Sequence, residues 1–529
     1  MNQTEATLTR SIEVLNTQTL RILKCFGKET VKKSTATVDI EQACYLINKN
    51  LYKKRTDLIY TGRTLFGNKP PMTNHIGNGF FSATIPRDAA FLHDLEAAYS
   101  NANVNVKIKQ DEAVPAQYKL NFAFADNTYV IETLHRIADQ HNLVCLLHEK
   151  PFAGINSSGK NILWTLNTDT QTNLFNPGTT QAENMQFLLF LTAVMQAVDE
   201  YQDIFRGSTA NTGNDHRLGC MDAPPIIVSL SLGDELTAFL SAIEQRGDIT
   251  AAPFPTIPPD YNQQNPTAPI FFTGTGFTFQ MPGASDCIAR SGIVFNTMVA
   301  DVLARFADEL ENAADFKTAL SKRICQSISN HKRIIFNGNP HNPHWKEEAH
   351  NRGLTLLPNT VDALTALLTE KSAALFTRHA VFTKTELTAQ YTQYVKHYIH
   401  TIQIEAATFI DIVKKQIIPA CINYQNDLTA LVAHKLEELA VYDSSLERQI
   451  LTQISNIGAN LLDLLRNLER MLAQAAIQPY ENELAHARYY NFHVAPAMAA
   501  LRQSVDELES VAAEKHWPLL TYGDLLYSL

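Results

Sequence analysis

The chain has 529 residues, of which 45% are hydrophobic and 19% charged, and its net charge is −10. That length can bury large cores and predicts two to four domains, while the missing basic surplus argues against a nucleic-acid partner. No stretch approaches the ~18–20 apolar residues of a membrane span, and residues 1–10 lack the apolar core of a signal peptide. The seven scattered cysteines are read as buried free thiols, so we expect a cytoplasmic protein.

Apolar spacing predicts an amphipathic helix over residues 9–26. The short basic run at residues 49–55 is interpreted as a solvated surface face. From residue 34 to about 294, short apolar runs typical of strands alternate with helical stretches and with loops rich in Gly, Pro and Asn. The strand-like runs are residues 43–47, 143–147, 226–232 and 277–281, and the helical stretches are 88–100, 128–141 and 184–201.

This pattern predicts an α+β fold with an open antiparallel sheet and loops gathered at one face. After residue 338 the chain becomes largely helical, and residues 420–478 contain no proline. Apolar residues recur at helical spacing from Ile450 to Leu472 and again from Met498 to Val511, which predicts a helical bundle. We therefore expect two domains, residues 1–338 and residues 339–529.

Several sequence blocks resemble type III glutamine synthetases, and together they span almost the whole chain. They include residues 51–67, 143–156, 213–219, 333–338, 404–412 and 517–522. The resemblance implies the glutamine synthetase catalytic fold followed by that family's helical C-terminal region. It does not include the family's amino-terminal β-grasp domain, so we expect a chain that lacks this domain.

The resemblance also implies a chemistry. Glutamine synthetases activate glutamate as γ-glutamyl phosphate, which ammonia then displaces, and two divalent cations held by carboxylates and one imidazole clamp the developing charge. The family's first metal motif, Glu-x-Glu, reads Glu41-Gln42-Ala43 here, and Glu112 stands at the next carboxylate position. Lys119 stands where another carboxylate is expected. A lysine about 4 Å from a divalent ion would repel it by roughly 8 kcal/mol at an effective dielectric constant of ~20.

The remaining positions are replaced in the same way. Asn161 stands at the family's histidine, Thr278 at its last metal glutamate and Gln280 at a catalytic arginine. The family's Arg-x-Arg loop aligns with Gln264 and the two residues after it. Arg217 is retained, but beside Asp215 and Asp222 a structural ion pair is favoured over a ligand clamp.

We therefore predict no catalytic, cofactor-binding or metal-binding residues and no cofactor. Lys119 is expected to form a salt bridge with Glu112, Glu41 or both. The remnant pocket would comprise Glu41, Glu112, Lys119, Asn161, Arg217, Gln264, Thr278 and Gln280.

The functional prediction is a non-catalytic pseudoenzyme that serves as a structural or regulatory subunit of a protein assembly. The alternatives are a metal-free sensor of glutamate or a nucleotide, and a ligase with altered γ-glutamyl chemistry. We expect protein partners only, through self-association or a hetero-complex, with an active glutamine synthetase or a larger assembly as candidates. Residues 404–475 should carry most of the association, with no nucleic acid and no membrane span.

Overall fold

The computed structural model describes residues 3–70, 86–110, 114, 116–247, 249, 254–258, 261, 268–438 and 443–527. The chain forms two compact units that interleave along the sequence. Unit 1 comprises Met1–Gln42, Leu120–Asn127 and Gly159–Tyr394, and unit 2 comprises Ala43–Lys119, Thr128–Ser158 and Val395–Leu529. The predicted two-domain division at residue 338 stays a prediction.

The sheet of unit 1 is built around β5 (Lys160–Thr168). The first part of β1 (Ser34–Asn48) pairs with β5 in antiparallel register, and β8 (Phe277–Phe279) pairs with its other edge. The order continues through β7 (Ile270–Phe272), antiparallel to β8, to β6 (Leu230–Ser231). β6 runs parallel to β7, so the prediction of an antiparallel sheet is wrong for this pair. The strand expected at residues 226–232 is also shorter, because its partner β7 is only three residues long.

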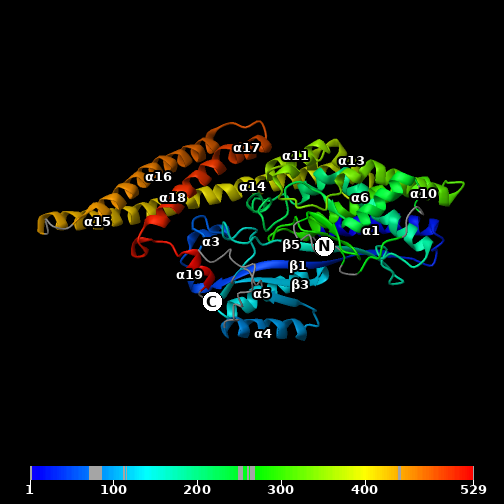
Figure 1. Ribbon diagram of the computed structural model, residues 1–529, viewed down its shortest axis with the longest axis horizontal. Coiled ribbons are helices and arrows are strands. Elements are labelled where there is room, and N and C mark those ends of the chain that lie inside the picture. The colour runs from blue at the N-terminus through cyan, green and yellow to red at the C-terminus, as the bar shows by residue number, and fades with distance from the viewer. Residues whose placement is uncertain are drawn as a thin grey trace. The chain divides into compact units, whose positions relative to one another are not determined.

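The core of unit 1 lies between this sheet and three long helices, α1 (Gln3–Cys25), α6 (Gln181–Ser208) and α9 (Ile288–Leu310) (Figure 1). α6 begins with a capping box, in which Thr180 and Glu183 satisfy each other's free backbone N–H groups. Nearly every side chain of α9 is buried. The fully buried Trp164 on β5 donates its indole N–H to Asn296 of α9, at 2.9 Å, which fixes the helix against the strand. The other helices of unit 1 are α7 (Asn214–Arg217), α8 (Asp234–Arg246), α10 (Phe316–His331), α11 (Pro343–Asn351), α12 (Thr360–Thr365) and α13 (Glu370–Arg378).

Unit 2 contains the second part of β1, which pairs with β4 (Leu143–Leu146). The smaller elements are β2 (Lys107–Gln110), α2 (Lys49–Tyr52), α3 (Thr56–Thr61), α4 (Pro86–Asn101), α5 (Asn127–Gln140), α17 (Glu483–Tyr489), α19 (Tyr522–Tyr527) and β3 (Gln117–Ala123), whose residues from Leu120 on belong to unit 1. The largest helices are α15 (Ile418–Glu438), α16 (Ser445–Ile477), α18 (Ala495–Val511) and α14 (Lys384–Ile412), whose residues up to Tyr394 belong to unit 1. α16 packs against α15 and α18, and these helices form an elongated hairpin (Figure 1). The buried stripe of α16 follows the predicted spacing, at Ile454, Ile457, Leu461, Leu465 and Leu468.

Three blocks of the resemblance meet in the core of unit 2, through the buried residues Leu58, Phe152 and Tyr522. The rings of Tyr45, Phe152 and Tyr522 pack edge to face, with centroids 5.3 and 5.2 Å apart. Arg55, at the end of the basic run, is buried and pairs with Asp57 at 2.6 Å. The prediction of a solvated face is therefore wrong at Arg55, whose guanidinium also donates to two backbone carbonyls in this core.

No helix among the described residues combines the length and the apolar character needed to cross a bilayer. None of the seven cysteines forms a disulfide in the described part of the chain, and Cys44 and Cys145 are the buried ones, so the prediction of buried thiols holds for these two alone.

Candidate functional site

The candidate site lies on one face of the unit 1 sheet. Glu41 of β1 pairs directly with Asn161 of β5, and Leu163 of β5 pairs with Thr278 of β8. Because successive residues of a strand point to opposite faces, these side chains share one face of the sheet. Gln280 lies just beyond β8 and two residues after Thr278, so its side chain points to the same face. The opposite face packs into the core with Ile40, Ile162, Trp164, Phe277 and Phe279, and the buried polar pair of Gln42 and Lys160 also lies on it.

Glu41 and Asn161 form a hydrogen-bonded pair. The amide nitrogen Nδ2 of Asn161 donates to the carboxylate oxygen Oε1 of Glu41 at 2.8 Å, and both side chains are partly exposed. Thr278 and Gln280 are buried, with 8% and 5% of their surfaces exposed. Four residues that the resemblance assigned to the remnant pocket therefore do lie together.

Arg217 supports this face from behind. Its guanidinium donates to the backbone carbonyls of Gln280, Met281 and Pro282, at 2.8, 3.1 and 3.3 Å. A Cβ atom on Gly159 would lie 2.1 Å from Nη2 of Arg217, so only glycine fits there. Arg217 thus holds the chain that leaves β8 through carbonyl contacts, and the ion pair expected for it beside Asp215 and Asp222 stays a prediction.

Asp215, two residues before Arg217, has Thr360 as its hydrogen-bond partner. The carboxylate of Asp215 accepts hydrogen bonds from the backbone N–H and the hydroxyl of Thr360, both at 2.8 Å. Burial raises the pKa of Asp215 to about 7, and the nearby charge of Arg206 opposes this rise. Asp215 therefore links α7 to the start of α12.

The structure does not place the other predicted pocket residues beside Glu41, Asn161, Thr278 and Gln280. Glu112 and Gln264 lie outside the described residues. Lys119 is a partly buried residue of β3 and belongs to unit 2, whereas Glu41 belongs to unit 1. The salt bridges expected for Lys119 stay a prediction.

The described residues do not fit the two-metal arrangement that the resemblance implies. Divalent cations such as Mg²⁺ and Mn²⁺ favour several oxygen ligands, usually with more than one carboxylate. This face carries the carboxylates of Glu41 and Asp39, and that of Glu41 is hydrogen-bonded to the amide N–H of Asn161, a group that cannot be a metal ligand. Among the residues that the structure describes, no three His, Cys, Asp or Glu side chains are grouped so as to hold a metal ion.

The sequence reading missed Asp39, which pairs with Leu163 and so lies on the same face as Glu41. Desolvation raises the pKa of Asp39 even though its side chain is largely exposed. The Asp-x-Glu spacing of Asp39 and Glu41 within a strand could have indicated it, because residues two apart share a face.

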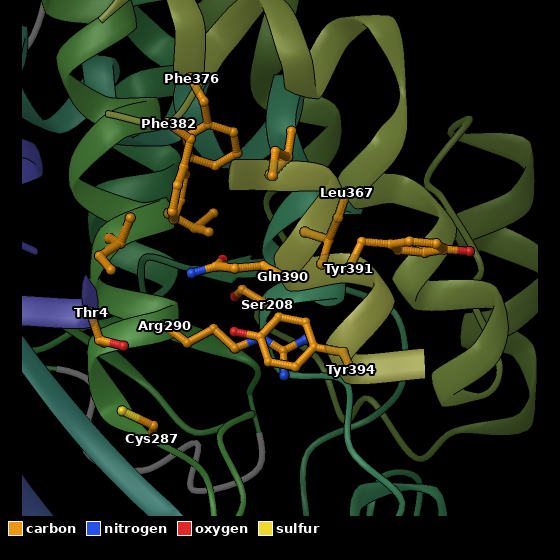
Figure 2. A pocket seen from close by; sticks show the side chains of 13 residues that line it. Thr4, Ser208, Cys287, Arg290, Leu367, Phe376, Phe382, Gln390, Tyr391 and Tyr394 are labelled. Carbon is orange, nitrogen blue, oxygen red and sulfur yellow. The ribbon is translucent and has the colours of Figure 1, made fainter. Parts of the chain in front are cut away.

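A separate cavity of about 80 Å³ lies among α1, α6, α9, α13 and α14 of unit 1 (Figure 2). Its walls are mostly aromatic and aliphatic, and the guanidinium of Arg290 stacks on the ring of Tyr394, 3.8 Å from the centroid (Figure 2). Sites for small-molecule substrates usually measure roughly 300–1,000 Å³. This cavity is too small for a nucleotide, so the strand face remains the candidate site.

Comparison with known proteins identifies the family. A model of the glutamine synthetase C-terminal domain matches residues 319–435. A glutamine synthetase of Butyrivibrio fibrisolvens is 34% identical and aligns with 99% of this chain and 77% of its own length. The chain belongs to the glutamine synthetase family. A type-3 glutamine synthetase of Dictyostelium discoideum is 33% identical, with 98% of this chain and 74% of that protein aligned.

Solved structures also resemble this glutamine synthetase homologue. A structure titled "Apo GmaS without ligand" has 13% sequence identity and a TM-score of 0.42, and the match covers 71% of this chain and 72% of the other. A GmaS complex with ADP has 14% identity and the same TM-score, with 73% and 74% covered. The α+β fold with a helical C-terminal region is confirmed by the elements of the chain itself, and the family match and the relatives make it glutamine synthetase-like.

The prediction of a non-catalytic subunit is wrong. The relatives that align with nearly the whole chain at 30–34% identity are named glutamine synthetases, including a third from Bacteroides fragilis. They point to a catalytic member of the family and not to a pseudoenzyme. The replaced residues predict a loss of activity only where no other group takes over their roles.

Proposed function

We propose that this chain is a type-3 glutamine synthetase, a ligase that joins ammonia to the γ-carboxylate of glutamate with ATP as the energy source. The observation that carries the proposal is the 34% and 33% identity to named glutamine synthetases over 99% and 98% of the chain. A cytoplasmic location belongs to the same proposal.

The reaction follows the family's chemistry in two steps. The γ-carboxylate of glutamate attacks the terminal phosphorus of ATP, which gives γ-glutamyl phosphate and ADP. Ammonia then attacks the γ-carbon, a proton is lost from nitrogen, and phosphate leaves. Because the described residues do not fit a divalent metal at Glu41, no step is assigned to a metal there.

The strand face supports this proposal through its polar groups. Glu41 carries a negative charge held in place by Asn161, 2.8 Å away, and a fixed charge can orient a substrate without reorganising during the reaction. Arg217 fixes the backbone on which Gln280 lies. The apolar layer beneath, with Trp164 and Phe279 fully buried, keeps this face rigid.

The test is direct synthesis of glutamine. Purified protein would be incubated with glutamate, ammonium chloride and magnesium ATP, and glutamine and ADP would be quantified by mass spectrometry. We expect glutamine to form in proportion to protein and only when all three substrates are present. A folded protein that forms no glutamine, while a named relative does so under identical conditions, would disprove the proposal.

A further inference from the structure

The cavity among α1, α6, α9, α13 and α14 has a buried apolar end and a polar rim. Phe376, Phe382 and Leu387 form the apolar end, and each is at most 5% exposed. In Figure 2, Phe376 and Phe382 lie above Arg290 and Tyr394. The partly or fully exposed side chains of the rim are Thr4, Cys287, Arg290, Gln390 and Tyr394. A molecule that enters from this rim would place an apolar group inside the cavity and keep a polar group near the solvent.

The volume of the cavity limits the size of the apolar group that can enter. A water molecule takes about 30 Å³ of the liquid, and an engineered cavity of about 150 Å³ holds benzene. The cavity of this chain measures about 80 Å³. It therefore has room for a propyl or isopropyl group but not for a six-membered ring.

The rim carries a positive charge. Arg290 is the charged residue among the described residues that line the cavity, and the lining contains no Asp or Glu. Its guanidinium donates to the backbone carbonyls of Gly207 and Ala210, at 2.6 and 3.0 Å, and stacks on the ring of Tyr394, so these three partners are neutral. The Nε–H of Arg290 has no hydrogen-bond partner among the described residues. The N-terminal end of α9, capped by Cys287, adds partial positive charge at the same rim. This side of the cavity therefore favours an anionic head group.

We propose that this cavity is a binding site for a short-chain carboxylate of the size of butyrate or isobutyrate. The hydrocarbon group fills the apolar end, and the carboxylate faces Arg290 at the rim. Arg63 and Glu405 show the same type of pairing within this chain, through two parallel hydrogen bonds. The inference goes beyond the proposed function, because none of the described residues of the strand face lines this cavity.

Thermal unfolding with a series of ligands tests size and charge without any turnover. Wild-type protein should melt about 1–2 °C higher in sodium isobutyrate than in sodium chloride of equal ionic strength, because a ligand of the folded state stabilises it. Acetate lacks the apolar group, benzoate exceeds the cavity, and isobutyramide has the same shape without the charge. None of these three should reproduce the rise. An equal rise with isobutyramide or with benzoate would refute the proposal.

Alkylation of Cys287 reports on the cavity itself. The thiol of Cys287 is exposed and lines the rim, so bound isobutyrate should slow its reaction with iodoacetamide several-fold, as measured by peptide mass spectrometry. Cys325 of α10 is partly exposed and does not line the cavity, so its rate should stay unchanged. Protection of both thiols, or of neither, would contradict binding in this cavity.

The variant Arg290→Gln tests the charge at the rim. Glutamine keeps N–H donors for the backbone carbonyls but removes the charge, so isobutyrate should bind about tenfold more weakly. Arg323→Gln is the matched control, because Arg323 is another ring-stacked arginine of unit 1, 5.3 Å from the centroid of Phe306, and does not line the cavity. Equal weakening in both variants, or in neither, would overturn the proposal. If Arg290→Gln does not fold, the wild-type comparison of isobutyrate with isobutyramide decides.

Discussion

At the scale of single residues, the clearest energetic feature is the buried pair of Arg63 and Glu405 in unit 2. Two parallel hydrogen bonds of 2.6 and 2.7 Å join the guanidinium to the carboxylate, and 6% and 1% of the two residues are exposed. Removing one partner leaves an uncompensated buried charge, so Arg63→Ala should lower the free energy of unfolding by about 3–5 kcal/mol. Urea denaturation would measure the change.

The control for this prediction is an exposed pair. Arg466 lies 3.6 Å from Asp463, and both side chains are largely in solvent. Arg466→Ala should change the free energy of unfolding by less than about 0.5 kcal/mol. Comparable losses in Arg63→Ala and Arg466→Ala would contradict the argument that burial makes the difference.

A second prediction at this scale concerns Gly67. Its φ is +137°, and a Cβ atom there would lie 2.3 Å from a ring carbon of Tyr522. Gly67→Ala should therefore destabilise the protein by about 1–3 kcal/mol through overpacking, seen as a lower melting temperature. Gly27 also has a positive φ, +72°, but no atom lies within 4 Å of the place that a Cβ atom would take, so Gly27→Ala should cost only the backbone strain. Equal losses in both variants would exclude the ring contact as the cause.

At the scale of elements, Asp215 couples α7 to α12 in a pH-dependent way. Its folded-state pKa of about 7 exceeds the ordinary aspartate value of about 3.9. Between these values the folded state holds a proton that the unfolded state has lost, so stability falls as pH rises from about 4 to 7. Asp215→Asn keeps an acceptor for Thr360 and removes this pH dependence of the stability.

The stability of Asp215→Asn relative to wild type should therefore increase from pH 4 to pH 8, by at most about 4 kcal/mol at 1.36 kcal/mol per pKa unit. Urea unfolding at several pH values would measure it. Asp463→Asn, at an exposed site, should instead parallel the wild-type profile. A profile of Asp215→Asn that also parallels wild type would show that Asp215 ionises normally.

Sequence patterns predicted an element best where its buried apolar residues recur at one regular spacing. The helix predicted at residues 128–141 is α5 (Asn127–Gln140), one residue earlier at each end. It could be predicted because the buried residues of α5 recur at helical spacing. β5 was missed even though Ile162, Trp164 and Leu166 alternate, since the preceding Gly159 and the polar residues between them resemble a loop. The contacts of Arg217 with carbonyls could not be predicted, because they depend on how the chain folds back after β8.

At the scale of the whole molecule, the sequence predicted the family correctly but predicted the activity wrongly. The blocks at residues 51–67, 143–156 and 517–522 contribute buried residues to unit 2, such as Phe66, Phe152 and Tyr522, so they report on the fold. Replacements such as Asn161 and Thr278 were read as decay, but the structure gathers them with Glu41 on one polar face. Local substitutions alone therefore do not decide between an altered site and an inactive one.

The final prediction concerns assembly, which we expect to involve the long helices of unit 2. Large apolar side chains remain exposed there, with Leu446 at 64%, Ile477 at 81% and Phe492 at 58%. Large exposed apolar side chains can take part in contacts between chains, and soluble proteins commonly assemble with closed symmetry. Mass photometry should find species larger than the 59.1 kDa chain. Ile477→Asp with Phe492→Asp should reduce their proportion, whereas Tyr129→Asp, at another exposed site of unit 2 (40%), should not. A wild-type protein that is monomeric at micromolar concentration would contradict this prediction, because these apolar side chains would then face water without a partner chain.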